Sequence, residues 1–130
     1  MAGDSTHGEF VRFRLGMKKI AKASNQELAA AVYEEALLVE QESRRRTPVD
    51  TGALRASHVT TIPEINKDEI RVEISVGGPA APYAVAVHEK VEVRHPVGQA
   101  KFLESAVLEA AREFPTRVAV RIDLNKVGKL

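Results

Sequence analysis

The feature that most restricts how this chain can fold is the segment from Ser24 to Pro48. It opens with "SNQE", a capping box in which the Ser24 side chain accepts from the Glu27 amide and the Glu27 side chain accepts from the Ser24 amide. Pro48 disfavours helical backbone at the residue before it. We therefore predict one long helix of about 20 residues between these signals. Its apolar stripe is Leu28, Val32, Ala36 and Val39, widened by Ala29, Tyr33 and Leu37, and its opposite face carries Glu34, Glu35, Gln41, Glu42 and Arg45.

The end of this helix leads into a corner that reads "TPVDTGALRAS". Three arginines stand in the last helical turn, where cations favour the negative end of the helix dipole. Asp50 or Thr51 is expected to cap a short helix over Gly52–Ser57. Leu54 would attach that short helix to the core. The three arginines are Arg44, Arg45 and Arg46.

Alternating apolar and polar residues predict several strands. Phe10–Leu15 reads "FVRFRL" and should end at Gly16, with a short helix over Met17–Ala23 after it. His58–Ile62 and Ile70–Val76 should form an antiparallel hairpin. A last strand is expected over residues 117–124, "RVAVRIDL", because a helix would scatter its four large apolar residues. These are Val118, Val120, Ile122 and Leu124.

Two further helices are expected in the second half of the chain. Tyr83–Glu89 is ambiguous between helix and strand, and we favour a short helix or extended turn packed on the core by Tyr83 and Val87. Gln99–Phe114 should be a helix that Pro115 ends. The sum is an α+β domain over residues 9–130, after a flexible leader at 1–8. A small antiparallel sheet of about four strands packs against the long helix and a second helix.

Composition sets limits on what this domain can do. Of its 130 residues, 44% are apolar and only 5% are aromatic, so the core is mainly aliphatic. The absence of cysteine excludes disulfides and thiolate metal sites. No apolar run approaches the roughly 20 residues of a membrane span. The first residues also lack the pattern of a secretory signal.

The sequence offers little for catalysis. His88, Glu89 and His95 invite a metal site, but the two histidines are seven residues apart and do not share a helical turn. Side chains of the neighbours Ser57 and His58 would diverge on a strand. The glycines of 77–82, "GGPAAP", lack the lysine and hydroxyl of a phosphate loop. We expect no enzyme activity, cofactor, metal or small-molecule substrate.

Charge is unevenly placed although the net charge is only +1. Residues 11–22 contain five bases and no acid, whereas residues 23–43 contain five acids and no base. The two segments could pair between neighbouring subunits, or they could be solvated faces of one monomer. A small DNA-binding module that uses residues 11–22 is the alternative function. The bases are Arg12, Arg14, Lys18, Lys19 and Lys22, and the acids are Glu27, Glu34, Glu35, Glu40 and Glu42.

Three short motifs occur in an order that resembles a known family. They are "TPVDTGALRAS", "PYAVAVHE" and "GQAKFLESA". With the strand and "LGMKKIAK" before them, they resemble the small tail-completion or head–tail joining proteins of long-tailed bacteriophages over nearly the whole chain after residue 8. The residues that carry the resemblance are Pro48, Asp50, Thr51, Gly52, Leu54 and Ser57, then Tyr83, Ala84, His88 and Glu89, then Lys101, Phe102, Leu103 and Ala106.

This resemblance implies a structural part of a virion, assembled in the host cytoplasm. It implies a homo-oligomeric ring at the neck, between the head's portal and closure proteins and the tail tube, with sixfold symmetry favoured over twelvefold. Neighbouring neck and tail proteins would be the partners, and DNA would pass through the lumen. The candidate contacts to subunits or DNA are Arg12, Arg14, Lys18, Lys19, Lys22, Glu34, Glu35, Arg44, Arg45 and Arg46.

Overall fold

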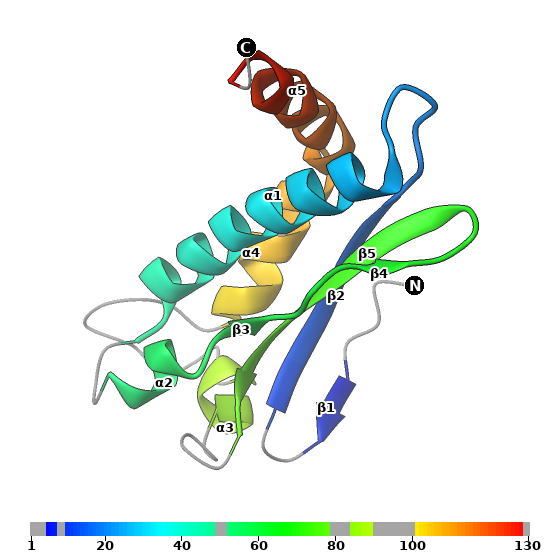
Figure 1. Cartoon of the computed structure of the whole chain (residues 1–130). Helices are drawn as coiled ribbons and strands as arrows, with labels where there is room; N and C mark the ends of the chain where they lie inside the picture. The colour runs from blue at the N-terminus through cyan, green and yellow to red at the C-terminus, as the bar shows by residue number, and fades with distance from the viewer. Residues whose placement is uncertain (1–4, 8–9, 49–51, 79–83, 90–100, 129–130) are drawn as a thin grey trace.

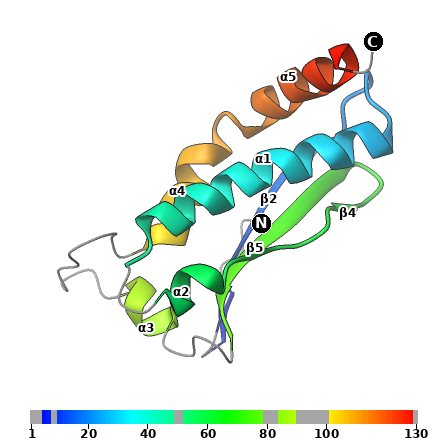
Figure 2. The same cartoon turned by 60° about the vertical axis from the view of Figure 1, so that its left-hand side comes forward.

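A computed structural model describes residues 5–7, 10–48, 52–78, 84–89 and 101–128. The chain folds as an α+β domain in which helices cover one face of an antiparallel sheet (Figures 1 and 2). The strands are β1 (Ser5–His7), β2 (Phe10–Lys18), β3 (Val59–Thr60), β4 (Glu64–Ile65) and β5 (Glu69–Gly77). The helices are α1 (Asn25–Arg46), α2 (Ala53–Ala56), α3 (Ala84–Glu89), α4 (Phe102–Ala111) and α5 (Phe114–Val127).

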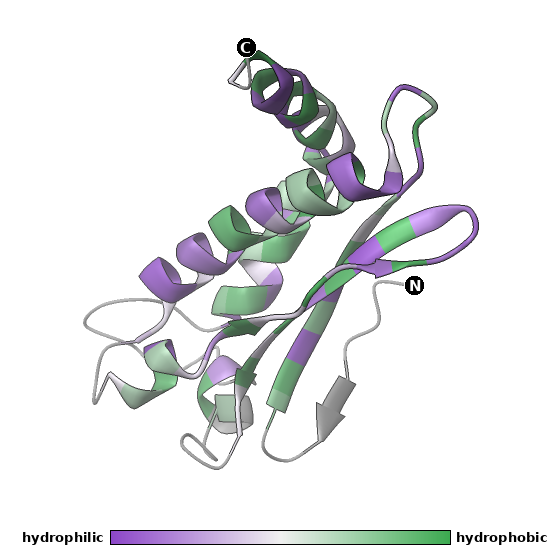
Figure 3. Cartoon of the chain, in the orientation of Figure 1, coloured by the Kyte–Doolittle hydropathy of each residue, from purple (hydrophilic) through white to green (hydrophobic). Residues whose placement is uncertain are grey.

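The sheet is built around the pairing of β2 with β5. Its strand order is β1-β2-β5-β3, and β4 also pairs with β5, so the described sheet has five strands rather than about four. Apolar residues alternate along both strands, as the colours of Figure 3 show. The register sets Phe13 opposite Ile74 and Leu15 opposite Val72. Since side chains of directly opposite residues share a face, the two strands present one continuous apolar surface.

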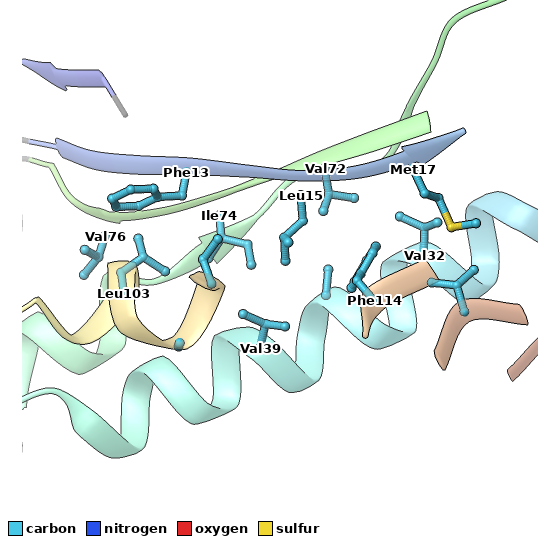
Figure 4. Packing of buried hydrophobic residues seen from close by; sticks show 14 of the residues in the cluster. Phe13, Leu15, Met17, Val32, Val39, Val72, Ile74, Val76, Leu103 and Phe114 are labelled. Carbon is cyan, nitrogen blue, oxygen red and sulfur yellow. The ribbon is translucent and has the colours of Figure 1, made fainter. Parts of the chain in front are cut away.

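Helix α1 covers that surface with the stripe expected from the sequence. The capping box at Ser24 and Glu27 is present and fixes the start of the helix. Helix α1 packs over β5 and β3, while α4 and α5 pack beside it and over β2 (Figure 4). The stripe residues Leu28, Val32, Ala36 and Val39 are all buried, as are Ile70, Val72, Ile74 and Val76 of β5. The long helix, the hairpin with its inward face and the short helix α3 are thus confirmed.

The first half of the chain corrects three expectations. Gly16 does not end the strand, because β2 continues to Lys18 and leaves no helix over Met17–Ala23. Residues 5–7 form β1, although they lie within the expected leader. The strand expected over His58–Ile62 shrinks to the two residues of β3, and Ile62 lies exposed beyond it.

The second half of the chain corrects two further expectations from the sequence. The expected helix over Gln99–Phe114 runs from Phe102 to Ala111 within the described residues. Pro115 does not end a helix but stands in the first turn of α5, where a proline loses no hydrogen bond. Residues 117–124 are therefore helical and not a strand. The helix does scatter the apolar residues, since it buries Val118 and Ile122 and exposes Val120 and Leu124.

Glu35 of α1 explains why α5 is held in this position. We expected Glu35 on the solvent face, but its side chain is only 5% exposed. It accepts from Nε of Arg117 at 2.8 Å and from Nε of Arg121 at 2.6 Å. Burial alone would raise the pKa of Glu35, but the hydrogen bonds and the positive charges of the two arginines together outweigh burial and lower that pKa. Two arginines one turn apart on α5 therefore donate to the same carboxylate on α1.

Gly16 offers a direct test of the β2–β5 pairing. A Cβ at this position would lie 2.8 Å from both the Arg71 Cβ and the Ile70 carbonyl oxygen. Since backbone must shift to admit it, Gly16→Ala should lower the free energy of unfolding by about 1–3 kcal/mol. Urea denaturation measures this difference.

Gly128→Ala is the matched control. An added Cβ there meets only carbonyl oxygens at 3.6 and 3.7 Å, and the backbone φ of −64° suits alanine. We expect it to change stability by less than about 0.5 kcal/mol. Equal effects of the two substitutions would contradict a close approach of the strands at Gly16.

Candidate functional site

The segments that carry the family resemblance meet at one end of the helix layer. The end of α1, the short helices α2 and α3, and the start of α4 lie together there (Figure 2). Phe102 of α4 is fully buried, and its ring centroid lies 4.9 Å from that of His88 and 6.0 Å from that of His58. We name this cluster the motif junction. It comprises the buried residues Leu54, His58, Ala84, His88, Phe102, Leu103 and Ala106.

His58 is the polar centre of the α1–α2 side of the junction. Its Nδ1 lies 2.9 Å from the Arg55 carbonyl oxygen, and its Nε2 lies 2.7 Å from Oγ of Ser43. A carbonyl only accepts, so Nδ1 carries the proton. Nε2 of the neutral ring therefore accepts from the Ser43 hydroxyl. This network ties the corner after α1 back to the helix.

Burial keeps the His58 ring neutral. It lowers the pKa of His58 to about 4, and the hydrogen bond to the Arg55 carbonyl only partly opposes that effect. The nearby Arg44 lowers the pKa further. A serine hydroxyl beside a neutral imidazole resembles a nucleophile–base pair. Ser43 is fully buried and His58 nearly so, however, and a substrate could not reach either atom in this arrangement.

His88 joins α3 to the start of α4. Its Nε2 accepts from the Glu104 amide at 3.3 Å, and its carbonyl oxygen accepts from the Lys101 amide at 2.6 Å. The Glu104 amide is one of the first amides of α4, which have no partner within the helix. Lys101, at the cap position, adopts a left-handed φ of 53° and supplies no side-chain cap. The imidazole of His88 thus supplies the cap from another helix.

Two arginines fasten the carboxyl end of α1. Arg55 of α2 donates to the carbonyl oxygens of Thr47 and Arg45 at 3.1 and 3.3 Å, where a helix has unpaired acceptors. Arg46 donates to Glu42 and to Oγ of Ser105, and it pairs with Glu109 of α4. These contacts fix the direction in which the chain leaves α1.

The motif residues expected from the sequence fall into three groups. Leu54, His88, Phe102 and Leu103 are buried in the junction, and Pro48 is buried beside it. Ser57 donates to the Leu54 carbonyl and accepts from the Gly77 amide, and Gly52 takes the left-handed cap position of α2 with φ of 79°. The third group lies outside the described residues and comprises Asp50, Thr51, Tyr83 and the side chain of Glu89. The capping role predicted for Asp50 or Thr51 therefore stays a prediction.

The charged residues expected at subunit or DNA contacts are dispersed. Arg12, Arg14 and Lys18 stand on the sheet face opposite the helices, where Arg14 lies 3.7 Å from Glu73 and Arg12 stacks 4.7 Å from the Phe10 ring. Lys22 pairs with Asp123 of α5 at 3.0 Å. Glu34 accepts from Asn125 at 2.8 Å.

The acids of α1 are therefore paired mainly within their own chain. Glu42 accepts from both Arg45 and Arg46, which lower the pKa of Glu42 to about 2. Arg44 pairs with Glu40 at 3.0 Å. Among the predicted contact residues, Lys19 is fixed through its backbone, since its amide donates a hydrogen bond to the Asp68 carbonyl oxygen at 2.9 Å. These partners leave Glu35 and Glu42 little capacity for the basic segment of a neighbouring subunit.

Besides Glu35, the sequence analysis missed three buried polar residues at the junction, Ser43, Thr47 and His58, although the first two carried a signal. Both continue the apolar stripe of α1, four and eight residues after Val39. Polar residues on a buried stripe require partners, since an unpaired buried hydroxyl is costly. Thr47 donates to the Ser43 carbonyl at 2.7 Å. No local signal identified His58 as the partner of Ser43.

Neither metal clusters nor membrane-spanning helices were found within the described ranges. No three histidine or acidic side chains in this part of the chain are placed to hold an ion together. No described helix combines the length and the apolar character needed to cross a bilayer. Comparisons with protein-family models, with curated proteins and with solved structures gave no match.

The lowered pKa of His58 predicts how stability depends on pH. Folded His58 takes up a proton only near pH 4, while in the unfolded chain it does so near 6.5. The free energy of unfolding should therefore be unaffected by His58 above about pH 6.5 and fall as the pH drops toward 4. The total loss is on the order of 3 kcal/mol. Urea denaturation between pH 4 and 7.5 measures it.

His58→Gln provides the comparison, because glutamine does not titrate. This variant should be less stable at neutral pH, and the stability difference from the wild type should shrink as the pH falls to about 4. Other titrating groups are common to both chains and cancel in that difference. A difference that stays constant across the range would rule out His58 as the responsible group.

Proposed function

We propose that this chain is a structural protein of a long-tailed bacteriophage virion, a ring-forming tail-completion or head–tail joining subunit at the neck. The single observation that carries the proposal is the convergence of the three motifs. They stand at residues 47–57, 82–89 and 98–106 of the sequence, and their described residues meet at one buried junction. Motifs that serve one structural purpose are expected to meet in this way.

The chemistry of the junction favours a scaffold over a catalyst. His58 and His88 are both buried, and each uses Nε2 as a hydrogen-bond acceptor within the fold. Their contacts fix the angle between α1, the hairpin and α4. A subunit that transmits position between the head and the tail depends on such fixed angles. On this proposal the chain has no substrate and no cofactor.

The open face of the sheet supports a place beside DNA. Arg12, Arg14 and Lys18 line one side of β2 and are not covered by the helix layer. Cations along a pore attract phosphates in a sequence-independent and salt-dependent way. In the proposed ring this face would turn toward the lumen through which DNA leaves the head. Contact with DNA is transient on this view, since Glu73 and Glu69 lie opposite Arg14 and Lys18.

The proposal predicts a ring of defined size. Electron microscopy and light scattering of the purified chain should show closed rings, with six subunits favoured over twelve. Mass spectrometry of purified tailed particles that carry this gene should detect the chain in fixed proportion to the tail proteins. Its absence from those particles would overturn the proposal.

A further inference from the structure

The two edges of the described sheet differ in how their backbone groups are satisfied. Beyond β5, the Thr61 amide donates to the Glu73 carbonyl oxygen at 2.9 Å, and the Glu73 amide donates to the Thr61 hydroxyl at 3.0 Å. The Asn66 amide donates to the Glu69 carbonyl oxygen at 2.9 Å. Strands β3 and β4 pair with β5 on either side of Thr61. The segment from β3 to β4 therefore closes this edge.

A contact just beyond β2 shows which way the backbone groups of that strand point. The Lys19 amide donates to the Asp68 carbonyl oxygen at 2.9 Å, which continues the register of the β2–β5 ladder by one pair. Hydrogen-bonded and non-hydrogen-bonded pairs alternate along an antiparallel ladder, so the odd-numbered residues of β2 bond to β5. The even-numbered residues face the other edge, where β1 pairs with residues 10–12.

Strand β2 runs on beyond the end of β1 and leaves part of this edge open (Figure 1). The open part comprises Arg14, Gly16 and Lys18, which are all exposed, and we name it the β2 edge. Within the part of the chain that the structure describes, no backbone partner meets their outward amides and carbonyl oxygens. An unpaired strand edge of this kind is a template for another strand.

The helix side of β2 is also less completely covered than that of β5. Phe13, Leu15 and Met17 keep exposed fractions of 7%, 4% and 8%, whereas the β5 residues opposite them keep at most 2%. A strand added at the β2 edge would place alternate side chains beside these three residues. Aliphatic side chains at those positions would extend the core.

A second copy of this chain is a poor occupant of the β2 edge. Two such edges paired through all three residues would centre on Gly16 and set Arg14 opposite Lys18, which places like charges together. The edge formed by β3 and β4 is blunted, because residues 61–63 stand against only two residues of β5 and form a bulge. Pro63 within that bulge donates no hydrogen bond. The strand that fits comes from a different protein.

Lys18 indicates what the incoming strand carries. Glu69 stands opposite Lys18 in the ladder, but its carboxylate lies 3.8 Å from Arg71. Lys18 forms no ion pair with any residue that the structure describes, and its side chain is exposed. An acidic residue directly opposite Lys18 on an added strand would share its face of the sheet. The charge of Lys18 therefore favours an acid at that position.

We propose that the β2 edge binds an extended segment of a partner protein by strand addition. The segment carries aliphatic residues toward the helix layer, alternating with polar residues on the open face, and an acid opposite Lys18. Main-chain hydrogen bonds supply affinity, and the alternating side chains supply specificity. This site goes beyond the proposed function, because it requires neither a ring nor DNA.

Amide hydrogen exchange of the full-length chain, followed by NMR, tests the edge residue by residue. In the free chain the amides of Arg14, Gly16 and Lys18 should exchange at least about tenfold faster than those of Leu15 and Met17, which bond to β5. The probe for the partner is a capped peptide, VEVTVTV, whose glutamate stands opposite Lys18 in antiparallel pairing. At millimolar concentration it should slow exchange at the three edge amides by about tenfold and leave Leu15 and Met17 unchanged.

Two controls separate the backbone from the side chains. The same peptide N-methylated at its glutamate and threonines cannot form the ladder and should give no protection. Lys18→Pro removes an edge amide without removing a bond to β5, a position at which proline is tolerated, and should weaken peptide binding about tenfold. Lys18→Gln keeps that amide and should weaken binding only about twofold. Exchange in the wild type decides the matter if Lys18→Pro does not fold.

Each other outcome overturns the site. Slow exchange at the edge amides of the dilute free chain would mean that the chain covers its own edge. Protection that rises with protein concentration would assign the edge to a second copy. Equal protection by the N-methylated peptide or by a short DNA duplex, or an equal loss in Lys18→Gln and Lys18→Pro, would exclude a main-chain ladder.

Failure of this site and failure of the proposed function are distinguishable. Closed rings and presence in virions without protection by the peptide would overturn strand addition and leave the proposed function intact. Protection by the peptide in a chain absent from virions would do the reverse.

Discussion

The contact between the apolar face of the β2–β5 ladder and the stripe of α1 supports the rest of this structure. Each large aliphatic side chain buried there contributes about 1.5–3 kcal/mol relative to exposure, so this interface outweighs any single polar contact in the fold. The contact requires that β2 and β5 stay in register over nine residues each. Gly16 permits this, because it lets the two strands approach closely at Arg71.

Polar groups then orient what the apolar contact brings together. Hydrophobic packing is not directional, so by itself it specifies the orientation of a helix less sharply than hydrogen bonds do. Glu35 fixes the placement of α5 relative to α1, because its two hydrogen bonds with arginines require one position of α5. His58 and His88 do the same for the corner after α1 and for the start of α4. Glu35, His58 and His88 are each buried, so misplacement of their partners would leave an unpaired polar atom in the core.

The sequence predicted those parts of the fold whose signals are local. The capping box and the 3.6-residue period identified α1, and the period of two identified β2 and β5. The strand predicted over residues 117–124 was wrong because the alternating pattern also places Val118 and Ile122 one helical turn apart. The contact that holds this segment as a helix on α1 is made with Glu35, which stands about 80 residues earlier in the sequence. The polar pairs of the junction could not be predicted from the sequence for the same reason, since their partners are far apart along the chain. Ser43 and His58, or His88 and the Glu104 amide, become partners only when distant segments meet.

The buried junction and the placement of α5 are connected through α4. His88 fixes where α4 begins, the turn before Pro115 redirects the chain, and Glu35 fixes where α5 lies. The position of α5 relative to the sheet is therefore set by buried polar contacts. In the proposed ring, a small error in the angle of each subunit would accumulate around the circle. On that proposal the buried residues that set these angles would influence assembly although they lie away from the surface, which gives a physical reason for a motif made of buried side chains.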